Sequence, residues 1–286
     1  CHVFELKFGL VLLNIENPMK IQGKTIVVTG GGNGIGRELS LQLLKGGARV
    51  IAVDLFADAL AETKKLAGDR AGNFSSHVLN IADRNAVEQF RDTVLQSGPV
   101  DGLINNAGII QPFIKVDELD YTAIERVVNV NFYGTLYLTK SFLSHFKSRP
   151  AAHIVNISSM GGFLPVPGQS VYGASKAAVK LLTEGLHLEL KNTNVKVTIV
   201  FPGAIATNIA ANSGVNIEMK PGSEKPQKFK ALPVQDAAAK IIKAMEQDAF
   251  RVTVGSDARF MDIIYRISPR RAAYFIYNKM KSMLGE

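Results

Sequence analysis

The feature that most constrains this chain is a glycine-rich turn, residues 29–36, with the sequence Thr-Gly-Gly-Gly-Asn-Gly-Ile-Gly. A β-branched apolar run at 24–28 precedes it and predicts a buried parallel strand. Apolar residues at helical spacing over 37–45, followed by two glycines, predict a helix after it. Glycines let a ligand approach the backbone of such a turn, and the positive end of the helix attracts an anion. The turn therefore predicts a site for the pyrophosphate of a dinucleotide.

The second predicted strand, residues 48–53, is followed by an acidic residue. Asp54 lies about 20 residues after the glycines. A carboxylate at this place accepts hydrogen bonds from the ribose hydroxyls of adenosine and repels a 2′-phosphate. Asp54 therefore favours NAD over NADP.

Strands and helices alternate along the rest of the chain. Further strands are predicted at 74–79, 100–104, 153–157, 195–201 and 251–254, and helices at 83–96, 121–146, 171–191 and 234–249. Repeated βα units of this length predict an α/β fold, a Rossmann-type doubly wound parallel sheet of about seven strands in three α/β/α layers. Ligands of such sheets bind at the carboxyl ends of the strands.

Composition limits the number of domains and the class of protein. With 286 residues, 47% hydrophobic and 20% charged, the chain fits one catalytic α/β domain at 19–256. No apolar run approaches the roughly 20 residues of a membrane-spanning helix. The single cysteine, Cys1, excludes an internal disulfide and any cysteine-based metal site, and it suits a reducing compartment such as the cytoplasm. No metal is expected. Residues 1–18 are interpreted as an N-terminal extension, native or added for expression, rather than a targeting signal.

Two residues of the helix at 171–191 suggest acid–base chemistry. Tyr172 and Lys176 are four positions apart and share one face of that helix. An ammonium beside a phenol favours the phenolate, so the pKa of Tyr172 is expected to fall below its free value of about 10. Such a tyrosine acts as a general acid or base on a carbonyl or alcohol oxygen. The alternative is an ordinary amphipathic helix with an exposed lysine and a half-buried tyrosine.

Two further polar residues are expected to face the same site. Ser159 comes just after the buried strand at 153–157, where its hydroxyl can point into the cleft, and Ser158 is the alternative at that turn. Asn131 lies inside the predicted helix 121–146, although asparagine is a poor helix former. A turn serine and an ordinary helix asparagine remain the alternative interpretations.

Together these residues resemble the motifs of the short-chain dehydrogenase/reductase family, in its single-domain branch. The matching motifs are Thr29-Gly30-x-x-x-Gly34-Ile35-Gly36, Asn105-Asn106-Ala107-Gly108, Asn131, Ser159, Tyr172-x-x-x-Lys176 and Pro202-Gly203 with Thr207. The resemblance implies that Tyr172 is the general acid/base and that Lys176 lowers its pKa and binds the nicotinamide ribose. It also implies that Ser159 hydrogen-bonds the substrate oxygen and that Asn131 holds a water in a proton relay.

The same resemblance implies an NAD site built from many short segments. Its residues are expected to be Thr29, Gly30, Asn33, Gly34, Ile35, Gly36, Asp54, Leu55, Asn80, Ile81, Asn106, Ala107, Gly108, Tyr172, Lys176, Pro202, Gly203 and Thr207. Asn80 departs from the family's usual aspartate, but its carbonyl can still accept from the adenine amine. Asn33 stands where NADP-preferring members often carry a basic residue, and Arg37 occurs in members of both preferences.

Residues 204–232 lie where this family places a mobile substrate lid. The lid and the loop at 163–166 are rich in apolar side chains, and no arginine or histidine cluster is placed to clamp an anionic group. This composition favours a lipophilic secondary alcohol or ketone as substrate. Simple packing of the lid on the body explains the same side chains equally well.

The C-terminal tail, residues 257–286, alternates basic with aromatic and aliphatic residues. Pro269 is expected to split it into two short helices. One interpretation is a peripheral contact with a membrane surface through 258–286, and the other is packing on the body or on a subunit partner. No nucleic-acid motif accompanies the net charge of +8, so no nucleic-acid partner is expected.

The predicted function is an NAD-dependent oxidoreductase that interconverts a lipophilic secondary alcohol and a ketone by hydride transfer, with Tyr172 as general acid/base. One alternative is an NADP-dependent carbonyl reductase. Another, from a different class, is a catalytically idle NAD(H)-binding sensor or scaffold protein. The family resemblance also implies a homodimer or homotetramer formed through the helices at 121–146 and 171–191.

Overall fold

The computed structural model describes residues 19–215 and 231–281, and its core is one sheet of seven parallel strands. The predicted extension at 1–18, the middle of the predicted lid and the last five residues lie outside the described residues. The strand order is β3-β2-β1-β4-β5-β6-β7. The strands are β1 (Thr25–Thr29), β2 (Arg49–Asp54), β3 (Phe74–Val78), β4 (Gly102–Asn105), β5 (Ala152–Ile157), β6 (Val195–Pro202) and β7 (Arg251–Val254). The predicted doubly wound α/β fold is therefore confirmed.

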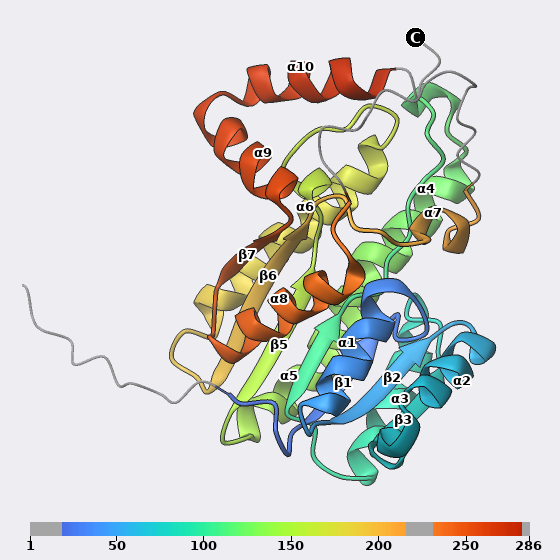
Figure 1. The fold of residues 1–286 in the computed structure, drawn as a ribbon, viewed down its shortest axis with the longest axis vertical. Helices are drawn as coiled ribbons and strands as arrows, with labels where there is room; N and C mark the ends of the chain where they lie inside the picture. Colours follow the sequence, from blue (N-terminus) through green and yellow to red (C-terminus); the bar gives the residue numbers. More distant parts are fainter. Residues whose placement is uncertain (1–18, 216–230, 282–286) are drawn as a thin grey trace, which may run out of the picture.

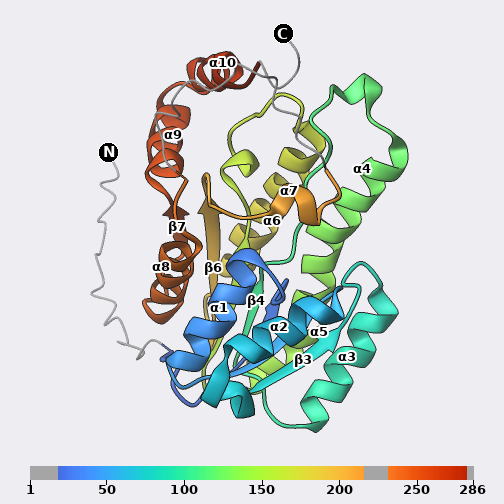
Figure 2. The same cartoon turned by 45° about the vertical axis from the view of Figure 1, so that its right-hand side comes forward.

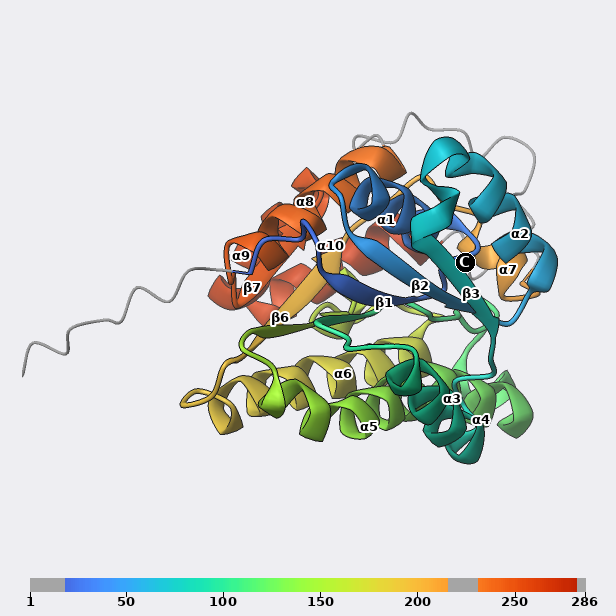
Figure 3. The ribbon, with the colours of Figure 1, turned by 90° about the horizontal axis from the view of Figure 1, so that it is seen from below.

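Helices cover both faces of this sheet and make the three layers that Figure 3 shows. Helices α1, α2 and α8 pack on one face, and α3, α5 and α6 pack on the other. The helices are α1 (Gly34–Lys45), α2 (Ala57–Leu66), α3 (Arg84–Gln96), α4 (Tyr121–Val128), α5 (Thr135–Ser148), α6 (Ser170–Glu189), α7 (Ile209–Asn212), α8 (Val234–Glu246), α9 (Ser256–Ile267) and α10 (Pro269–Met280). Short 3-10 turns occur at Gly68–Asn73, Val116–Glu118 and Met160–Gly162.

Strand β1 shows why its apolar run is unbroken. Successive side chains of a strand point to opposite faces, so a strand covered on both sides needs apolar residues at every position. Ile26 and Val28 join the cluster under α1 with Leu39. Val27 joins the cluster on the other face with Phe142 of α5. Ile26, Val27 and Val28 and the two helix side chains that they contact are all fully buried. This burial on both faces is typical of a central strand.

The site's position follows from the strand order. Strands β2 and β3 lie on one side of β1, and β4 to β7 lie on the other, so the order reverses between β1 and β4. The connections diverge at this point and leave a crevice at the carboxyl ends of the strands. Figures 1 and 2 show the short helix α7 and the loops after β4 and β5 at this end of the sheet.

The prediction of one unbroken α-helix at 121–146 is wrong in one respect. The structure divides it into α4, a π-helical segment at Asn129–Gly134, and α5. The carboxamide of Asn131 makes two hydrogen bonds to the backbone of Ile109, one through Oδ1 and one through Nδ2, both 2.9 Å. A π-helical turn of this kind inserts one extra residue into the helix, often at a functional site.

The C-terminal residues form α9 and α10, and the predicted break at Pro269 is confirmed. Proline fits the first turn of α10 because that turn needs no N–H donor there. Met261 of α9 and Ala272 and Ile276 of α10 are buried against Leu164. The inner face of the tail therefore packs on the body. No helix in the described ranges is long and apolar enough to cross a membrane.

Candidate active site

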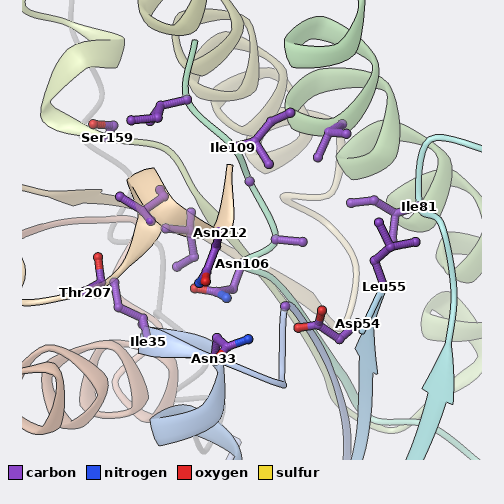
Figure 4. Close-up of a pocket in the computed structure, with 18 of the residues that line it drawn as sticks. Asn33, Ile35, Asp54, Leu55, Ile81, Asn106, Ile109, Ser159, Thr207 and Asn212 are labelled. Carbon is purple, nitrogen blue, oxygen red and sulfur yellow. The ribbon is translucent and has the colours of Figure 1, made fainter. Parts of the chain in front are cut away.

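A cleft of about 640 Å³ opens at the carboxyl ends of the strands and contains most of the predicted residues. In Figure 4, Asp54, Leu55 and Ile81 lie at one end of this cleft and Ser159 lies at the other. The predicted residues that line it are Gly30, Asn33, Gly34, Ile35, Asp54, Leu55, Asn80, Ile81, Asn106, Ala107, Gly108, Ser159, Tyr172, Lys176, Pro202, Gly203 and Thr207. An elongated cleft of this kind has room for a ligand with two separate ends.

The glycine-rich turn needs glycine for two physical reasons. Gly30 and Gly34 have φ values of 67° and 51°, in the left-handed region that favours glycine. A Cβ on Gly36 would collide with the carbonyl oxygen of Gly30. Gly36 therefore lets α1 approach the turn, although it does not itself line the cleft.

The N-terminus of α1 is prepared for an anion. Within the described residues, its N-cap Asn33 makes no side-chain capping bond, and the first turn carries no acidic residue. Among the described α-helices, only α3 and α4 have a capping side chain, from Asp83 and Asp120, so it is the glycine-rich turn before α1 that distinguishes this N-terminus. The first N–H groups of α1 thus lack a side-chain acceptor at the helix end where an anion is most stable. This arrangement fits the pyrophosphate of a dinucleotide.

Asp54 is held in place by the backbone on both sides of it. Its Oδ2 accepts from the N–H of Gly32 at 2.9 Å, and its Oδ1 accepts from the N–H of Phe56 at 3.2 Å. Arg37 is engaged elsewhere, because its Nε donates to the carbonyl of Gly32 at 2.8 Å and to Thr63 Oγ1 at 3.2 Å. At this end of the cleft the Asp54 carboxylate therefore lines the wall, whereas the Arg37 guanidinium is bonded to the glycine-rich turn and does not line it.

Thr29 lies behind the cleft rather than in its wall. Its Oγ1 accepts from the N–H groups of Asn106 and Ala107, both at 3.0 Å, and Asn106 Nδ2 donates to the carbonyl of Thr29 at 3.0 Å. These bonds join the ends of β1 and β4 at the point where the strand order reverses. Thr29 therefore positions two residues of the cleft wall.

The environment of Tyr172 corrects one expectation. Burial raises the pKa of the Tyr172 phenol, and a hydrogen bond with Ser159 lowers it by less. The pKa of Tyr172 is thus raised overall, and the predicted fall is wrong for the protein without ligand. The physical reason is that Lys176 Nζ donates to the carbonyl of Ile157, at 3.0 Å, rather than to the phenol.

Lys176 is a buried cation beside the predicted nicotinamide end. Its side chain is 4% exposed, and burial lowers its pKa to about 8. A Cβ on Gly108 would lie 2.9 Å from its Nζ, so glycine at 108 leaves the space that the ammonium occupies. Lys176 therefore lies in the cleft wall with little water around it.

The structure distinguishes the two serines at the end of β5. Ser158 is buried, and its Oγ donates to the carbonyl of Lys176 at 2.7 Å. Ser159 Oγ accepts from the N–H of Gly161 at 3.1 Å and forms the hydrogen bond with Tyr172. Ser159 is thus the serine that shares a reaction zone with Tyr172.

Asn131 reaches Tyr172 through a second residue. Its Nδ2 donates to Ser175 Oγ at 3.0 Å, and Ser175 Oγ donates to the carbonyl of Tyr172 at 2.7 Å. Asn131 is fully buried and does not line the cleft. Its position connects the π-helical segment to the backbone of Tyr172.

Gln111 was missed by the sequence reasoning. This fully buried residue accepts at Oε1 from the N–H groups of Val171 and Tyr172, both at 2.9 Å. Its Nε2 donates to the carbonyl of Gly168 at 3.0 Å. Gln111 thus caps the N-terminus of α6 in place of an N-cap side chain. A glutamine in a loop 60 residues away carries no local signal of this role.

The cleft wall also contains residues outside the predicted site, including Ser158, the alternative to Ser159 named above. They are Val53, Phe56, Leu79, Ala82, Ile109, Ile110, Arg126, Asn129, Val130, Ile157, Ser158, Ala204, Ile205, Ile209 and Asn212. Val53, Leu79 and Ile157 are the last residues of predicted strands, and this position is the signal that could have identified them. Helix α7 contributes Asn212 from above the cleft, and its neighbour Ser213 accepts from the N–H of Ile110 at 3.0 Å. This bond ties α7 to the loop after β4.

Comparison with known families decides the identity of this site. The family model described as short chain dehydrogenase matches residues 24–217. The chain belongs to the short-chain dehydrogenase/reductase family. The oxidoreductase SadH of Mycobacterium tuberculosis is 39% identical over 252 residues, which cover 86% of this chain and 91% of that protein. The 3-ketodihydrosphingosine reductase of Mus musculus is 32% identical over 248 residues, 84% of this chain and 74% of that protein.

Solved structures of this family carry both kinds of nicotinamide cofactor. A short chain dehydrogenase/reductase from Burkholderia phymatum in complex with NAD has a TM-score of 0.74 at 26% identity, over 82% of this chain and 90% of that one. A short chain dehydrogenase from Burkholderia cenocepacia in complex with NADP has a TM-score of 0.75 at 26% identity, over 90% and 99%. The chain is therefore an NAD(P)-dependent oxidoreductase of this family.

Proposed function

We propose that this short-chain dehydrogenase/reductase uses NAD to interconvert a lipophilic secondary alcohol and the corresponding ketone. The proximity of the Tyr172 phenol, the Ser159 hydroxyl and the buried Lys176 ammonium in one cleft carries the proposal. The cofactor, when bound, supplies or accepts the hydride. Tyr172 exchanges a proton with the substrate oxygen, and Ser159 donates a hydrogen bond to that oxygen. For Lys176 we keep the binding of the nicotinamide ribose that the family resemblance implies, and for Asn131 the implied water of a proton relay.

The preference for NAD rests on Asp54. Its carboxylate lies at the end of the cleft opposite Ser159, where the adenosine ribose would bind. A second negative charge on a 2′-phosphate would meet this carboxylate at short range, with the nearby Arg37 guanidinium already bonded to Gly32 and Thr63. These contacts support NAD over the alternative, an NADP-dependent carbonyl reductase.

Apolar side chains of the cleft wall support a lipophilic substrate. Ile109, Ile110, Ile205 and Ile209 line the cleft, and its lining within residues 19–215 and 231–281 includes no histidine. Among the described residues that line the cleft, Arg126 is the one arginine. The similarity to a 3-ketodihydrosphingosine reductase is consistent with this substrate class. We extend the proposal to a homodimer or homotetramer through α4, α5 and α6, and to a peripheral contact of the tail with a membrane surface.

Nicotinamide absorbance during turnover tests the proposal. The assay compares NAD(H) with NADP(H) on a panel of lipophilic secondary alcohols and ketones. Tyr172→Phe should lower kcat by at least about 100-fold, because general acid–base catalysis contributes 10² to 10⁴. The dissociation constant for NADH, measured by fluorescence, should remain close to that of the wild type.

Each other outcome contradicts a different part of the proposal. Turnover with NADP(H) alone would overturn the role of Asp54. Full activity of Tyr172→Phe would overturn the role of Tyr172. Tight NADH binding without turnover on any substrate of the panel would favour the idle sensor or scaffold protein.

A further inference from the structure

The outer face of α9 and α10 combines exposed apolar side chains with positive charge. Its exposed apolar and aromatic members are Phe260, Ile263, Ile267, Tyr274, Phe275 and Tyr277. Ile267 is 79% exposed, although burial of such a side chain in an apolar medium is favourable. The rings of Phe260 and Phe275 are 6.4 Å apart, so the two helices form one continuous face. We call this face the tail surface.

Basic and acidic residues of α9 and α10 have different surroundings. Residues 256–281 contain six basic and two acidic residues, hence a net charge of +4. Both acidic groups are bonded to the body of the protein: Asp257 Oδ2 accepts from the N–H of Ala204 at 2.6 Å, and Asp262 pairs with Arg251 of β7 at 2.7 and 2.9 Å. The outward charge is therefore almost entirely positive.

The basic side chains of the tail surface have few acidic neighbours. Of the six, Arg266 alone lies within 4.0 Å of a carboxylate in the part of the chain that the structure describes. The others are Arg259, Arg270, Arg271, Lys279 and Lys281. Arg270 and Lys279 instead lie over the rings of Tyr274 and Phe275, at 5.8 and 6.0 Å.

Arg270 and Arg271 occupy an unfavourable place in α10. They fall in its first turn, which holds no acidic residue. Positive charge there opposes the positive end of the helix dipole and lowers the stability of the helix. An anionic partner outside the protein would offset this repulsion, which points to a partner rather than to folding as the reason for the two arginines.

We infer that the tail surface binds a lipid membrane surface that carries anionic headgroups. Aromatic and aliphatic side chains enter the boundary between headgroups and acyl chains, while lysine and arginine attract the anionic lipids. A second copy of the chain is a poor partner because two surfaces of net positive charge repel each other. A nucleic acid would leave Ile263 and Ile267 in water.

The tail surface is connected to the substrate end of the cleft. The inner side of α9 and α10 packs on Leu164, and the ring of Tyr265 lies 6.1 Å from that of Phe163. Both partners belong to the loop that follows Ser159. Figures 1 and 2 show α9 and α10 beyond the carboxyl ends of the strands, at the same end of the sheet as the cleft. A docked protein would therefore hold its substrate end close to the lipid. The inference extends the membrane contact of the proposed function and is independent of the cofactor.

Vesicle flotation of the full chain tests the inference, with phosphatidylcholine vesicles compared with vesicles that also contain phosphatidylserine. We expect at least about tenfold stronger binding to the anionic vesicles, reduced by salt. Arg270→Glu with Arg271→Glu should lower this binding at least about tenfold. Lys64→Glu with Lys65→Glu, exposed on α2, makes the same charge change and should have little effect. Ile267→Asn should weaken binding, whereas Leu66→Asn on α2 should not.

The other outcomes each overturn the inference. Equal binding to both vesicle types, or equal loss in the α2 control, would remove the role of charge at the tail surface. Absence of vesicle binding together with a dimer that Ile267→Asn dissociates would identify a second copy as the partner. Binding of duplex DNA that Arg270→Glu with Arg271→Glu abolishes would identify a nucleic acid. Turnover of a substrate added in detergent should be the same in all variants, so a failed membrane contact and a failed catalytic assignment are distinguishable.

Discussion

At the scale of single residues, Ser158 and Ser159 show how neighbours of one type acquire different tasks. Strand β5 ends between them and sends one hydroxyl to the carbonyl of Lys176 and the other to the phenol of Tyr172. Sequence reasoning could reduce the choice to these two residues. The residues alone left Ser158 and Ser159 as alternatives, and the family resemblance implied Ser159. Which hydroxyl faces Tyr172 depends on where α6 packs relative to the end of β5.

The hydrogen bond from Ser159 predicts a measurable pH effect. This bond lowers the pKa of Tyr172 against the rise that burial causes. In Ser159→Ala the pKa should rise further, so the midpoint of the kcat/KM profile for alcohol oxidation should move to higher pH. Ser158→Ala is the matched control, since it removes a bond to Lys176 and should lower stability with the midpoint in place. A midpoint that moves equally in both variants would contradict the assignment.

Lys176 predicts a pH dependence of stability in the protein without cofactor. Its pKa is about 8 in the folded chain and about 10.4 in the unfolded one. Between these values the unfolded chain holds a proton that the folded chain has lost, so folding becomes more favourable as the pH rises. The free energy of unfolding of the wild type, relative to Lys176→Met, should therefore increase by about 2 kcal/mol between pH 7.5 and 10. Urea unfolding at several pH values measures this, and parallel curves for the two proteins would contradict it.

At the scale of elements, the segment after β4 binds three parts of the site. Ile109 is bonded to Asn131 of the π-helical segment, Ile110 to Ser213 beside α7, and Gln111 to the N-terminus of α6. The sequence predicted the strand and the helix that flank this segment. These three connections are hydrogen bonds between residues far apart in sequence, so no local sequence pattern predicts them.

The cap of α6 predicts that Gln111 matters for catalysis as well as stability. Gln111→Met removes the acceptor for the N–H groups of Val171 and Tyr172, and should cost about 1 kcal/mol of stability. It should also lower kcat/KM, because Tyr172 loses a bond that fixes its backbone. Gln111→Glu keeps the acceptor for these two N–H groups but places a second oxygen against the carbonyl of Gly168, so it should retain more activity than Gln111→Met and less than the wild type.

A cap elsewhere in the fold separates the two effects of Gln111. Asp83 accepts from the N–H of Ala86 at 3.1 Å and caps α3, and it does not itself line the cleft. Asp83→Ala should therefore reduce the melting temperature to a similar extent and leave kcat/KM unchanged. If it reduced kcat/KM as much as Gln111→Met does, the loss would reflect stability alone.

At the scale of the whole molecule, the sequence predicted what depends on local chemistry. The buried strands, the glycine turn, the acidic end of β2 and the break at Pro269 each follow from the preferences of a few adjacent residues. The direction of the Tyr172 pKa, the π-helical segment and the sorting of tail charges depend on how distant elements pack. The half-buried position of Tyr172, for example, exists only after α6 has packed beside the end of β5.

Cofactor preference can be measured through the stability of the whole fold. A ligand that binds only the folded chain stabilises it by about 2.7 kcal/mol at 100 times its dissociation constant, which should raise the melting temperature by about 5 °C or more. Equal concentrations of NAD and NADP should therefore give a larger shift with NAD, because the Asp54 carboxylate repels the 2′-phosphate. Asp54→Ala should reduce the shift with NAD and increase the shift with NADP. Asp58→Ala removes a nearby exposed charge of α2 that does not line the cleft, and should leave both shifts as in the wild type. A wild type that NADP stabilises as strongly as NAD would show that the Asp54 carboxylate accommodates the extra phosphate.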